Sequence, residues 1–369
     1  MKISYKHLVD SISEKPDLNN ISEKLFQLGH EHEICDDIFD IEITPNRGDC
    51  LSLNGLLRDL NLFYDISNKK DIYQKEIAPL SLEFTNNVEK CCKKISFLKI
   101  EIDVVPEKYI GELGDYFSAF NIKKNNFFTD VSNFISYENG QPTHCYDFLK
   151  INSPIKLDFT NKIYEFDTLL DKKIKVDKSN MVFFDNEGEV INLAGIIGGK
   201  KTACQQNTKS VLVECAYFDP ELIIGKSVKY DINSDAAYKF ERNVDPNCHN
   251  YVLRRFIRII EKNTDINNIE LVSFKYGEVE ENKILFNLNK INKILGININ
   301  EAECLGYLTK LDFKVNDQII YVPSHRNDIF TINDIAEEIA RAIGYNNIQP
   351  MSFRINQNNN KKNTCDDYK

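Results

Sequence analysis

Asn139-Gly-Gln-Pro-Thr-His-Cys-Tyr-Asp-Phe148 is a loop bounded by glycine and proline that holds a single imidazole, His144. Downstream, Asn192-Leu-Ala-Gly-Ile-Ile-Gly-Gly199 runs from an apolar strand into glycines, and Ser210-Val-Leu-Val-Glu-Cys-Ala-Tyr-Phe218 places one carboxylate, Glu214, in an apolar strand. Glycines let a ligand approach the backbone, and a charge in an apolar strand needs a partner or a purpose. These three stretches together predict a reaction pocket.

Each stretch also has a purely structural interpretation. His144 alone is more often a satisfied loop histidine than a catalytic group. Gly198-Gly199 alone is most often a turn or a bulge, and Glu214 alone could be a strand residue on the solvent face. The three stretches in this order are therefore more specific than any one of them.

Length, charge and cysteine content limit the function classes. The chain has 369 residues, enough for two or three domains. A formal net charge of −10 argues against a broad footprint on nucleic acid, so any RNA contact should be local or shared, and no DNA partner is expected. Ten cysteines without a Cys-x-x-Cys pair indicate reduced thiols. Without an apolar signal core or a run long enough for a membrane span, we expect a cytoplasmic protein with no membrane partner.

Patterning along the chain predicts a multidomain α+β protein. Helical signals dominate the first domain (1–85), and strand-like alternation predicts a mixed-sheet domain over 90–250. A connector is expected at 251–283. Helix, helix, hairpin and helix over 284–350 are typical of a small winged-helix-like domain, and the polar tail 351–369 should be disordered.

The ordered motifs resemble the β subunit of bacterial phenylalanine–tRNA ligase. The family's VDxTN, GQPxHAFD, LAGxxGG and ExAxFxP patterns correspond to residues 129–133, 140–147, 193–199 and 214–220, and its TDAxxRFERGVDP pattern is similar to 234–246. The resemblance implies a B3/B4-like editing domain over the mixed sheet.

Motifs outside the central domain carry the same resemblance. Residues 43–53 resemble ITPNRxDCLSxxG in a B1-like domain, and 322–329 with 334–345 resemble VPSxRxDI and DLxEEIARxxGY in a B5-like domain. Most bacterial relatives carry an RNA-binding module where only Ile34–Asp40 stands here, and the family continues into further domains beyond Pro350. We therefore expect a β subunit that lacks this insert and the C-terminal domains.

The resemblance implies hydrolytic editing of mischarged tyrosyl-tRNA(Phe). Glu214 would accept a hydrogen bond from the tyrosine phenol, which phenylalanine cannot donate. His144 would orient or activate water, while Ser132 and Asn133 would bond the amino acid or the terminal ribose. The backbone at Ala194, Gly195 and Gly198 would line the substrate pocket.

A second site is implied near the C-terminus. The resemblance places a Mg²⁺ site, shared with the α subunit, on four carboxylates: Asp328, Asp334, Glu337 and Glu338. On the residues alone, a solvated acidic face paired with Arg326 and Arg341 is favoured over a metal site, and the resemblance makes the two interpretations equally open.

In the family, ATP-dependent charging of tRNA(Phe) resides mainly in the α subunit of an α2β2 assembly. No ATP-binding motif of the ligase is visible here, so the chain alone is expected only to hydrolyse mischarged tRNA. Two alternatives remain open, a free-standing editing hydrolase and a truncated, non-catalytic binding or scaffold remnant.

Overall fold

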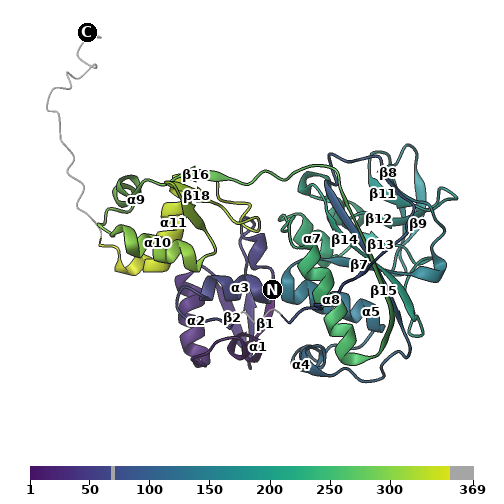
Figure 1. Cartoon of the computed structure of the whole chain (residues 1–369), viewed down its shortest axis with the longest axis horizontal. Helices are drawn as coiled ribbons and strands as arrows, with labels where there is room; N and C mark the ends of the chain where they lie inside the picture. Colours follow the sequence, from purple (N-terminus) through teal and green to yellow (C-terminus); the bar gives the residue numbers. More distant parts are fainter. Residues whose placement is uncertain (68–70, 350–369) are drawn as a thin grey trace, which may run out of the picture.

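The computed structural model describes residues 1–67 and 71–349, which form three bodies (Figure 1). The N-terminal body (purple) and the C-terminal body (yellow-green) lie side by side, and the larger central body lies next to them. The tail predicted to be disordered, 351–369, lies outside the described residues. Within the described ranges, no helix is long and apolar enough to cross a bilayer.

The N-terminal body is a small α+β unit. Its elements are β1 (Lys2–Ser4), α1 (Tyr5–Asp10), α2 (Leu18–Gln27), β2 (His32–Cys35), β3 (Ile38–Ile41), a 3-10 turn (Gly48–Cys50) and α3 (Leu53–Leu60). The strands form an antiparallel sheet in the order β1-β3-β2. Asp17 accepts a hydrogen bond from the Asn20 N–H at 2.9 Å and so caps α2. Only Asp36 and Asp37 separate β2 from β3, so a tight hairpin stands where the resemblance places the RNA-binding module of relatives.

Two five-stranded sheets form the central body. The first has the order β4 (Ala78–Pro79), β15 (Ile266–Lys275), β6 (Lys94–Ile102), β14 (Ser210–Tyr217) and β7 (Thr143–Asp147). The second has the order β13 (Ile197–Gly198), β12 (Val190–Leu193), β11 (Met181–Phe184), β8 (Ile155–Phe159) and β5 (Phe84–Asn86). A separate hairpin pairs β9 (Tyr164–Asp167) with β10 (Lys173–Val176).

Strand β14 is buried on both faces, which explains its apolar sequence. Val211 and Val213 pack into the core under the helices, whereas Leu212 and Ala216 pack into the core between the sheets. Successive side chains of a strand point to opposite faces, so Glu214, in phase with Leu212, points toward the second sheet. The helices of this body are α4 (Gly111–Phe120), α5 (Phe127–Asn139), α6 (Lys226–Tyr230), α7 (Asp235–Phe240) and α8 (His249–Asn263).

The structure corrects the predicted connector at 251–283. Helix α8 packs on β6 and β14, and β15 pairs along the length of β6, so both belong to the central body. The reason lies in the buried stripe of α8, which includes Val252, Phe256 and Ile260 and needs a core to cover it. Strand β5, from the stretch predicted as N-terminal, likewise pairs with β8.

The C-terminal body follows the predicted order of helix, helix, hairpin and helix. Its elements are β16 (Lys283–Leu285), α9 (Leu288–Leu295), α10 (Glu301–Lys310), β17 (Lys314–Asn316), β18 (Ile319–Tyr321), α11 (Ile332–Ile343) and a 3-10 turn (Tyr345–Asn347). The additional strand β16 joins the hairpin in a sheet of order β16-β18-β17. The three bodies together confirm the predicted multidomain α+β fold, with a mixed-sheet domain flanked by two small ones.

Buried ion pairs join the N-terminal and C-terminal bodies. Arg341 of α11 donates to the Asp59 carboxylate of α3 and, through Nε, to the Leu28 carbonyl at 2.9 Å. The same guanidinium contacts both oxygens of Glu338 at 2.8 and 2.9 Å. A single arginine therefore holds carboxylates from two bodies.

An arginine arrangement recurs on either side of this contact. Arg47 forms two-pronged pairs with Asp49, two residues on, and Asp59, twelve residues on. Arg326 forms the same two pairs with Asp328 and Glu338 at the same spacing. Planar guanidinium groups favour such bidentate contacts. Arg47 therefore connects its loop to α3, and Arg326 connects its loop to α11.

Candidate functional site

Two cross-strand pairs, one in each sheet of the central body, bring the predicted pocket residues together. Glu214 lies opposite His144 in the β14–β7 pairing, and Asn192 lies opposite Gly198 in the β12–β13 pairing. The Asn192 amide reaches across the inter-sheet core and donates to Glu214 Oε2 at 3.2 Å. Residues that are far apart in the sequence thus meet because two sheets pack face to face.

Glu214 is a buried carboxylate held by neutral donors. Its side chain is 4% exposed, and Oε2 accepts a hydrogen bond from Tyr146 Oη at 2.6 Å in addition to the Asn192 amide. Burial raises the pKa of the Glu214 carboxyl to about 7, while the two hydrogen bonds lower it. Among the described residues Oε1 has no hydrogen-bond partner, so this oxygen can accept a bond from a ligand.

His144 keeps its imidazole neutral. Burial lowers its pKa to about 4, and the ring stands edge-on to Tyr146 with 4.4 Å between centroids. Its Nε2 is covered and lacks a hydrogen-bond partner among the described residues. A buried polar atom without a partner carries a free-energy cost, and a neutral imidazole nitrogen can accept a proton from water.

Gly198 leaves the space that the imidazole fills. A Cβ at this position would lie 2.1 Å from His144 Cε1 and 2.6 Å from Nε2. The β9–β10 turn closes the same corner, since the Leu169 N–H donates to the Gly198 carbonyl at 3.0 Å. Glycine is needed here because the ring packs directly on the backbone.

The other predicted site residues lie in the β12–β13 turn and on helix α5. Ala194 and Gly195 form the turn between β12 and β13, and Gly195 has a positive φ of 70° with the Phe218 and Ile223 side chains beside it. Ser132 of α5 bonds the Thr143 carbonyl at 2.7 Å, which anchors the residue before His144.

Two of the predicted residues are less engaged with the centre than expected. The Ser132 hydroxyl already forms hydrogen bonds with the carbonyl and the Oγ1 of Thr143. Ser132 as a residue is 7% exposed. Asn133 lies on the exposed face of α5. The structure therefore brings His144, Gly198 and Glu214 into direct proximity, and Ser132 reaches them only through Thr143.

Sequence reasoning missed Tyr146 and Asn192. Tyr146 stands two residues after His144 in a strand, so the period of two puts both rings on one face. Asn192 is the only polar side chain of β12, and its burial between sheets requires hydrogen-bond partners. The strand period at Tyr146 and the single polar residue of β12 could both be seen in the sequence. Neither shows that the two side chains contact Glu214.

The four carboxylates predicted to bind Mg²⁺ do not fit one metal centre. Asp328 and Glu338 are each paired with Arg326 through both oxygens. Asp334 accepts the Thr331 N–H as part of the capping box of α11, and Glu337 is exposed. Among the described residues, no three of the four bring ligand atoms within 4.8 Å of one another. Guanidinium groups stand as counter-charge instead, so the predicted pairing with Arg326 and Arg341 agrees with the contacts. The predicted solvated face does not, because Glu338 and both arginines are buried.

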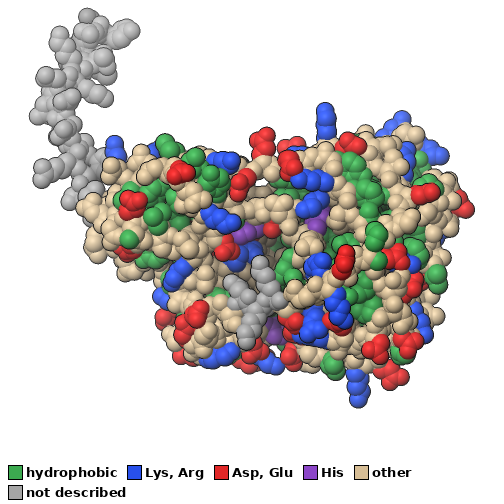
Figure 2. Space-filling view, in the orientation of Figure 1, with side chains coloured by type: hydrophobic (Ala, Val, Ile, Leu, Met, Phe, Trp, Pro, Cys, Tyr) green, Lys and Arg blue, Asp and Glu red, His purple; other side chains and the backbone are tan. Residues whose placement is uncertain are grey.

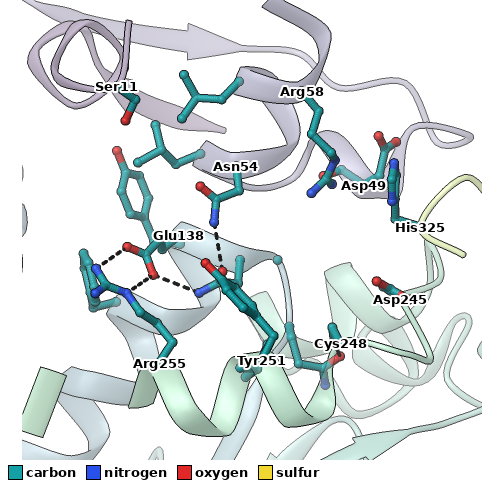
Figure 3. Close-up of a pocket in the computed structure, with 18 of the residues that line it drawn as sticks. Ser11, Asp49, Asn54, Arg58, Glu138, Asp245, Cys248, Tyr251, Arg255 and His325 are labelled. Carbon is teal, nitrogen blue, oxygen red and sulfur yellow. Dashed lines mark hydrogen bonds and ion pairs between the residues drawn. The ribbon is translucent and has the colours of Figure 1, made fainter. Parts of the chain in front are cut away.

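A separate polar cleft of about 580 Å³ lies between the N-terminal and central bodies (Figure 3). Glu138 on its floor pairs with Arg255 at 2.7 Å, and Arg58 and Asp49 face His325 across its far end. Ion pairs inside the protein already neutralise the Glu138 and Asp49 carboxylates of this cleft. Its lining includes none of His144, Gly198 and Glu214.

Comparisons with known proteins agree with this architecture. Residues 109–265 match the family model described as B3/4 domain, and residues 284–345 match the model described as tRNA synthetase B5 domain. The phenylalanine–tRNA ligase β subunit of Ehrlichia canis (strain Jake) is 29% identical over 94% of this chain. Those of Fusobacterium nucleatum and Rickettsia prowazekii (strain Madrid E) are 32% and 31% identical over 85% and 88%. The chain belongs to the phenylalanine–tRNA ligase β-subunit family.

The family match is confined to part of the relatives' length. The chain spans 44% of the Ehrlichia protein, 40% of the Fusobacterium protein and 43% of the Rickettsia protein. A solved N-terminal fragment of the phenylalanyl-tRNA synthetase β subunit from Pyrococcus horikoshii has a TM-score of 0.50 and 14% identity. The match covers 93% of this chain and 99% of the fragment. The likeness to this β-subunit fragment shows a shared fold.

Proposed function

We propose that this chain hydrolyses tyrosyl-tRNA(Phe) as the editing part of a phenylalanine–tRNA ligase β subunit. The observation that carries the proposal is the cross-strand pair of His144 and Glu214, a neutral imidazole beside a carboxylate with one unpartnered oxygen. Such a pair combines a proton acceptor for water with an acceptor for a phenol. Both are what selective hydrolysis of a tyrosyl ester requires.

The proposed reaction is a simple ester hydrolysis. A water molecule attacks the ester carbonyl carbon while His144 Nε2 takes one of its protons. The carbon–oxygen bond to the ribose then breaks, the ribose oxygen takes the proton from the imidazolium, and free tyrosine and tRNA leave. Nε2 has no hydrogen-bond partner among the described residues, which leaves its lone pair available for this role.

Selectivity is assigned to Glu214. Oε1 would accept the tyrosine hydroxyl, and phenylalanine would leave this buried acceptor without a partner. An unmade hydrogen bond in a buried site is penalised more than a missing contact at the surface. The turn from Ala194 to Gly198 would cover the substrate ring, with Ser132 and Asn133 toward the amino acid or ribose.

We further propose that tRNA(Phe) and the ligase α subunit are partners, and that the assembly supports ATP-dependent charging with phenylalanine. Family membership supports this assignment. On the face shown in Figure 2, basic and acidic side chains are interspersed rather than gathered into one basic field. That pattern favours a local RNA contact shared with a partner. The four carboxylates do not fit a metal centre, and the proposed hydrolysis uses only His144, Glu214 and water.

Deacylation by the purified chain tests the proposal. We expect tyrosyl-tRNA(Phe) to be hydrolysed faster than phenylalanyl-tRNA(Phe), and His144→Ala to slow it about 100-fold. Glu214→Ala should remove the preference between the esters, and Glu101→Ala, on the neighbouring strand β6, is the matched control.

Unchanged hydrolysis in both the His144→Ala and the Glu214→Ala variants would contradict the assignment. If only addition of the α subunit restores hydrolysis, the chain is a dependent subunit rather than a free-standing hydrolase, and no hydrolysis in either case indicates a binding remnant.

A further inference from the structure

Tyr146 packs beside His144 and contacts Glu214, and the proposed reaction gives it no role. It is 1% exposed and lies on β7, two residues after His144. Burial and the neighbouring Glu214 carboxylate raise the pKa of its phenol well above the usual value. The hydroxyl therefore keeps its proton and acts as a donor.

The hydroxyl takes part in a closed triangle of polar groups. It donates to Glu214 Oε2 at 2.6 Å and accepts from Asn192 Nδ2 at 2.8 Å, while the same amide lies 3.2 Å from Oε2. Two donors, from strands β7 and β12, thus hold one carboxylate oxygen of Glu214 on β14. The other oxygen, Oε1, has no hydrogen-bond partner in the described part of the chain.

Among the described residues, no cation neutralises this carboxylate. The titratable groups that face it are Tyr146 and the neutral His144 on β7, together with buried thiols of which Cys92 and Cys215 feel its charge. None of these carries a positive charge at neutral pH. The ionised form of Glu214 therefore depends on the two neutral donors at Oε2.

We propose that Tyr146 is a positioning residue for substrate selectivity, which holds Oε2 of Glu214 so that Oε1 alone is presented to the phenol of a tyrosyl ester. The inference rests on the proposed editing function and narrows its substrate class to esters whose side chain ends in a hydroxyl donor. In this arrangement the protein's own phenol occupies one oxygen and the substrate's phenol occupies the other.

Loss of the Tyr146 hydroxyl has a defined consequence. Glu214 would lose one of the two donors that stabilise its charge, so its pKa would rise further. At neutral pH most Glu214 carboxyl groups would then be protonated, and only the Asn192 amide would still hold Oε2. A protonated carboxyl presents a mixture of donor and acceptor, so discrimination between tyrosyl and phenylalanyl esters would weaken.

Tyr146→Phe tests the inference with two independent measurements. The first is the titration of the Glu214 carboxyl by ¹³C NMR in full-length protein, assigned through Glu214→Gln. The second is the ratio of kcat/KM for tyrosyl-tRNA(Phe) and phenylalanyl-tRNA(Phe), after subtraction of spontaneous hydrolysis. Tyr230→Phe is the matched control, because Tyr230 is also buried and its hydroxyl donates to a carboxylate, Asp177, at 2.8 Å.

We expect Tyr146→Phe to raise the pKa of Glu214 and to lower the selectivity ratio about tenfold at neutral pH, the size of one hydrogen bond to a charged group. The ratio should recover as the pH is raised, because the carboxylate ionises again, and a merely structural defect would not show this recovery. Tyr230→Phe should change neither quantity.

Other outcomes overturn the inference. An unchanged Glu214 pKa would mean that Tyr146 does not hold the carboxylate, and an unchanged or increased ratio would mean that it does not direct Oε1 to the substrate. If the wild-type chain, alone and with the α subunit, hydrolyses neither ester, the proposed function fails together with the substrate part of the inference. The titration still decides the positioning part.

Discussion

The hydroxyl of Tyr146 lies 2.6 Å from Oε2 of Glu214, between two sheets, and no cation from residues 1–67 or 71–349 stands beside the carboxylate. Burial of a carboxyl group without a cationic partner disfavours its charged form. The pocket therefore contains a carboxylate that the fold pays to keep. Such a cost points to function, and it gives the stability of the protein a measurable pH dependence.

Glu214→Gln should remove this dependence. The folded-state pKa, about 7, lies above the ordinary value of 4.5, so the folded protein retains a proton that the unfolded chain releases. The contribution of Glu214 to the free energy of unfolding is therefore lost progressively as the pH rises from about 4.5 to 7. We expect Glu214→Gln to be more stable than wild type at pH 8, by on the order of 3 kcal/mol, and equal to it near pH 4.

Urea unfolding at several pH values measures this difference. Glu101→Gln is the control, because Glu101 is partly exposed and paired with Lys99 Nζ at 2.9 Å. Its unfolding free energy should follow that of wild type across the whole range. Parallel profiles for wild type and Glu214→Gln would show that the carboxylate is not held in the buried environment described.

Gly198→Ala should displace His144. The new Cβ would lie 2.1 Å from His144 Cε1 and 2.6 Å from His144 Nε2, distances that real Cβ contacts do not reach. We expect a loss of about 1–3 kcal/mol in stability from overpacking and at least a tenfold loss of deacylation. Gly306→Ala in α10 is the control, because its Cβ meets open space and a helix gains stability from alanine. A fully active Gly198→Ala protein would contradict the role of His144.

The sequence was sufficient for the motifs and for the type of most elements, but it was not sufficient for the partners. Strand periodicity in 210–217 places Glu214 on one face, and the same period places Tyr146 beside His144. What no local pattern contains is the packing of the second sheet, which brings Asn192 within 3.2 Å of Glu214. The completed triangle is therefore a product of tertiary structure.

The same limit explains the carboxylates of the C-terminal body. Helical spacing places Asp334 and Glu338 one turn apart, as the sequence indicates. It does not indicate that Arg326, twelve residues before Glu338 and outside the helix, occupies both oxygens of this carboxylate. The sequence has the same twelve-residue spacing from Arg47 to Asp59. Only the geometry of the two loops shows that each spacing corresponds to an ion pair.

Arg341→Leu should weaken the contact between the N-terminal body and the C-terminal body. Burial raises the pKa of the Asp59 carboxyl, but Arg341 and Arg47 outweigh it and hold this pKa well below its usual value. Without Arg341, Asp59 and Glu338 each lose a donor while remaining buried. We expect a loss of about 3–5 kcal/mol in the free energy of unfolding, the usual result of breaking a buried pair.

Arg258→Leu is the matched control for this variant. Arg258 pairs with Glu261 at 2.7 Å, but its side chain is 36% exposed, compared with 7% for Arg341. An exposed pair contributes less than about 1 kcal/mol. If the two leucine variants lose equal stability in urea unfolding at neutral pH, the ion pairs between the bodies are not the source of the cohesion described.

Magnesium should have no specific effect on the stability of this chain. A ligand that binds only the folded state raises the midpoint of unfolding, and millimolar MgCl₂ should here act no differently from NaCl of equal ionic strength. Asp334→Ala should cost about 1 kcal/mol through the lost capping box of α11, and Glu338→Ala should cost several times more, because Arg326 and Arg341 lose their shared partner. Both losses should be the same with and without Mg²⁺. A Mg²⁺-dependent rise in the wild-type midpoint that disappears in both variants would instead support the carboxylate metal site and overturn the arginine-paired interpretation.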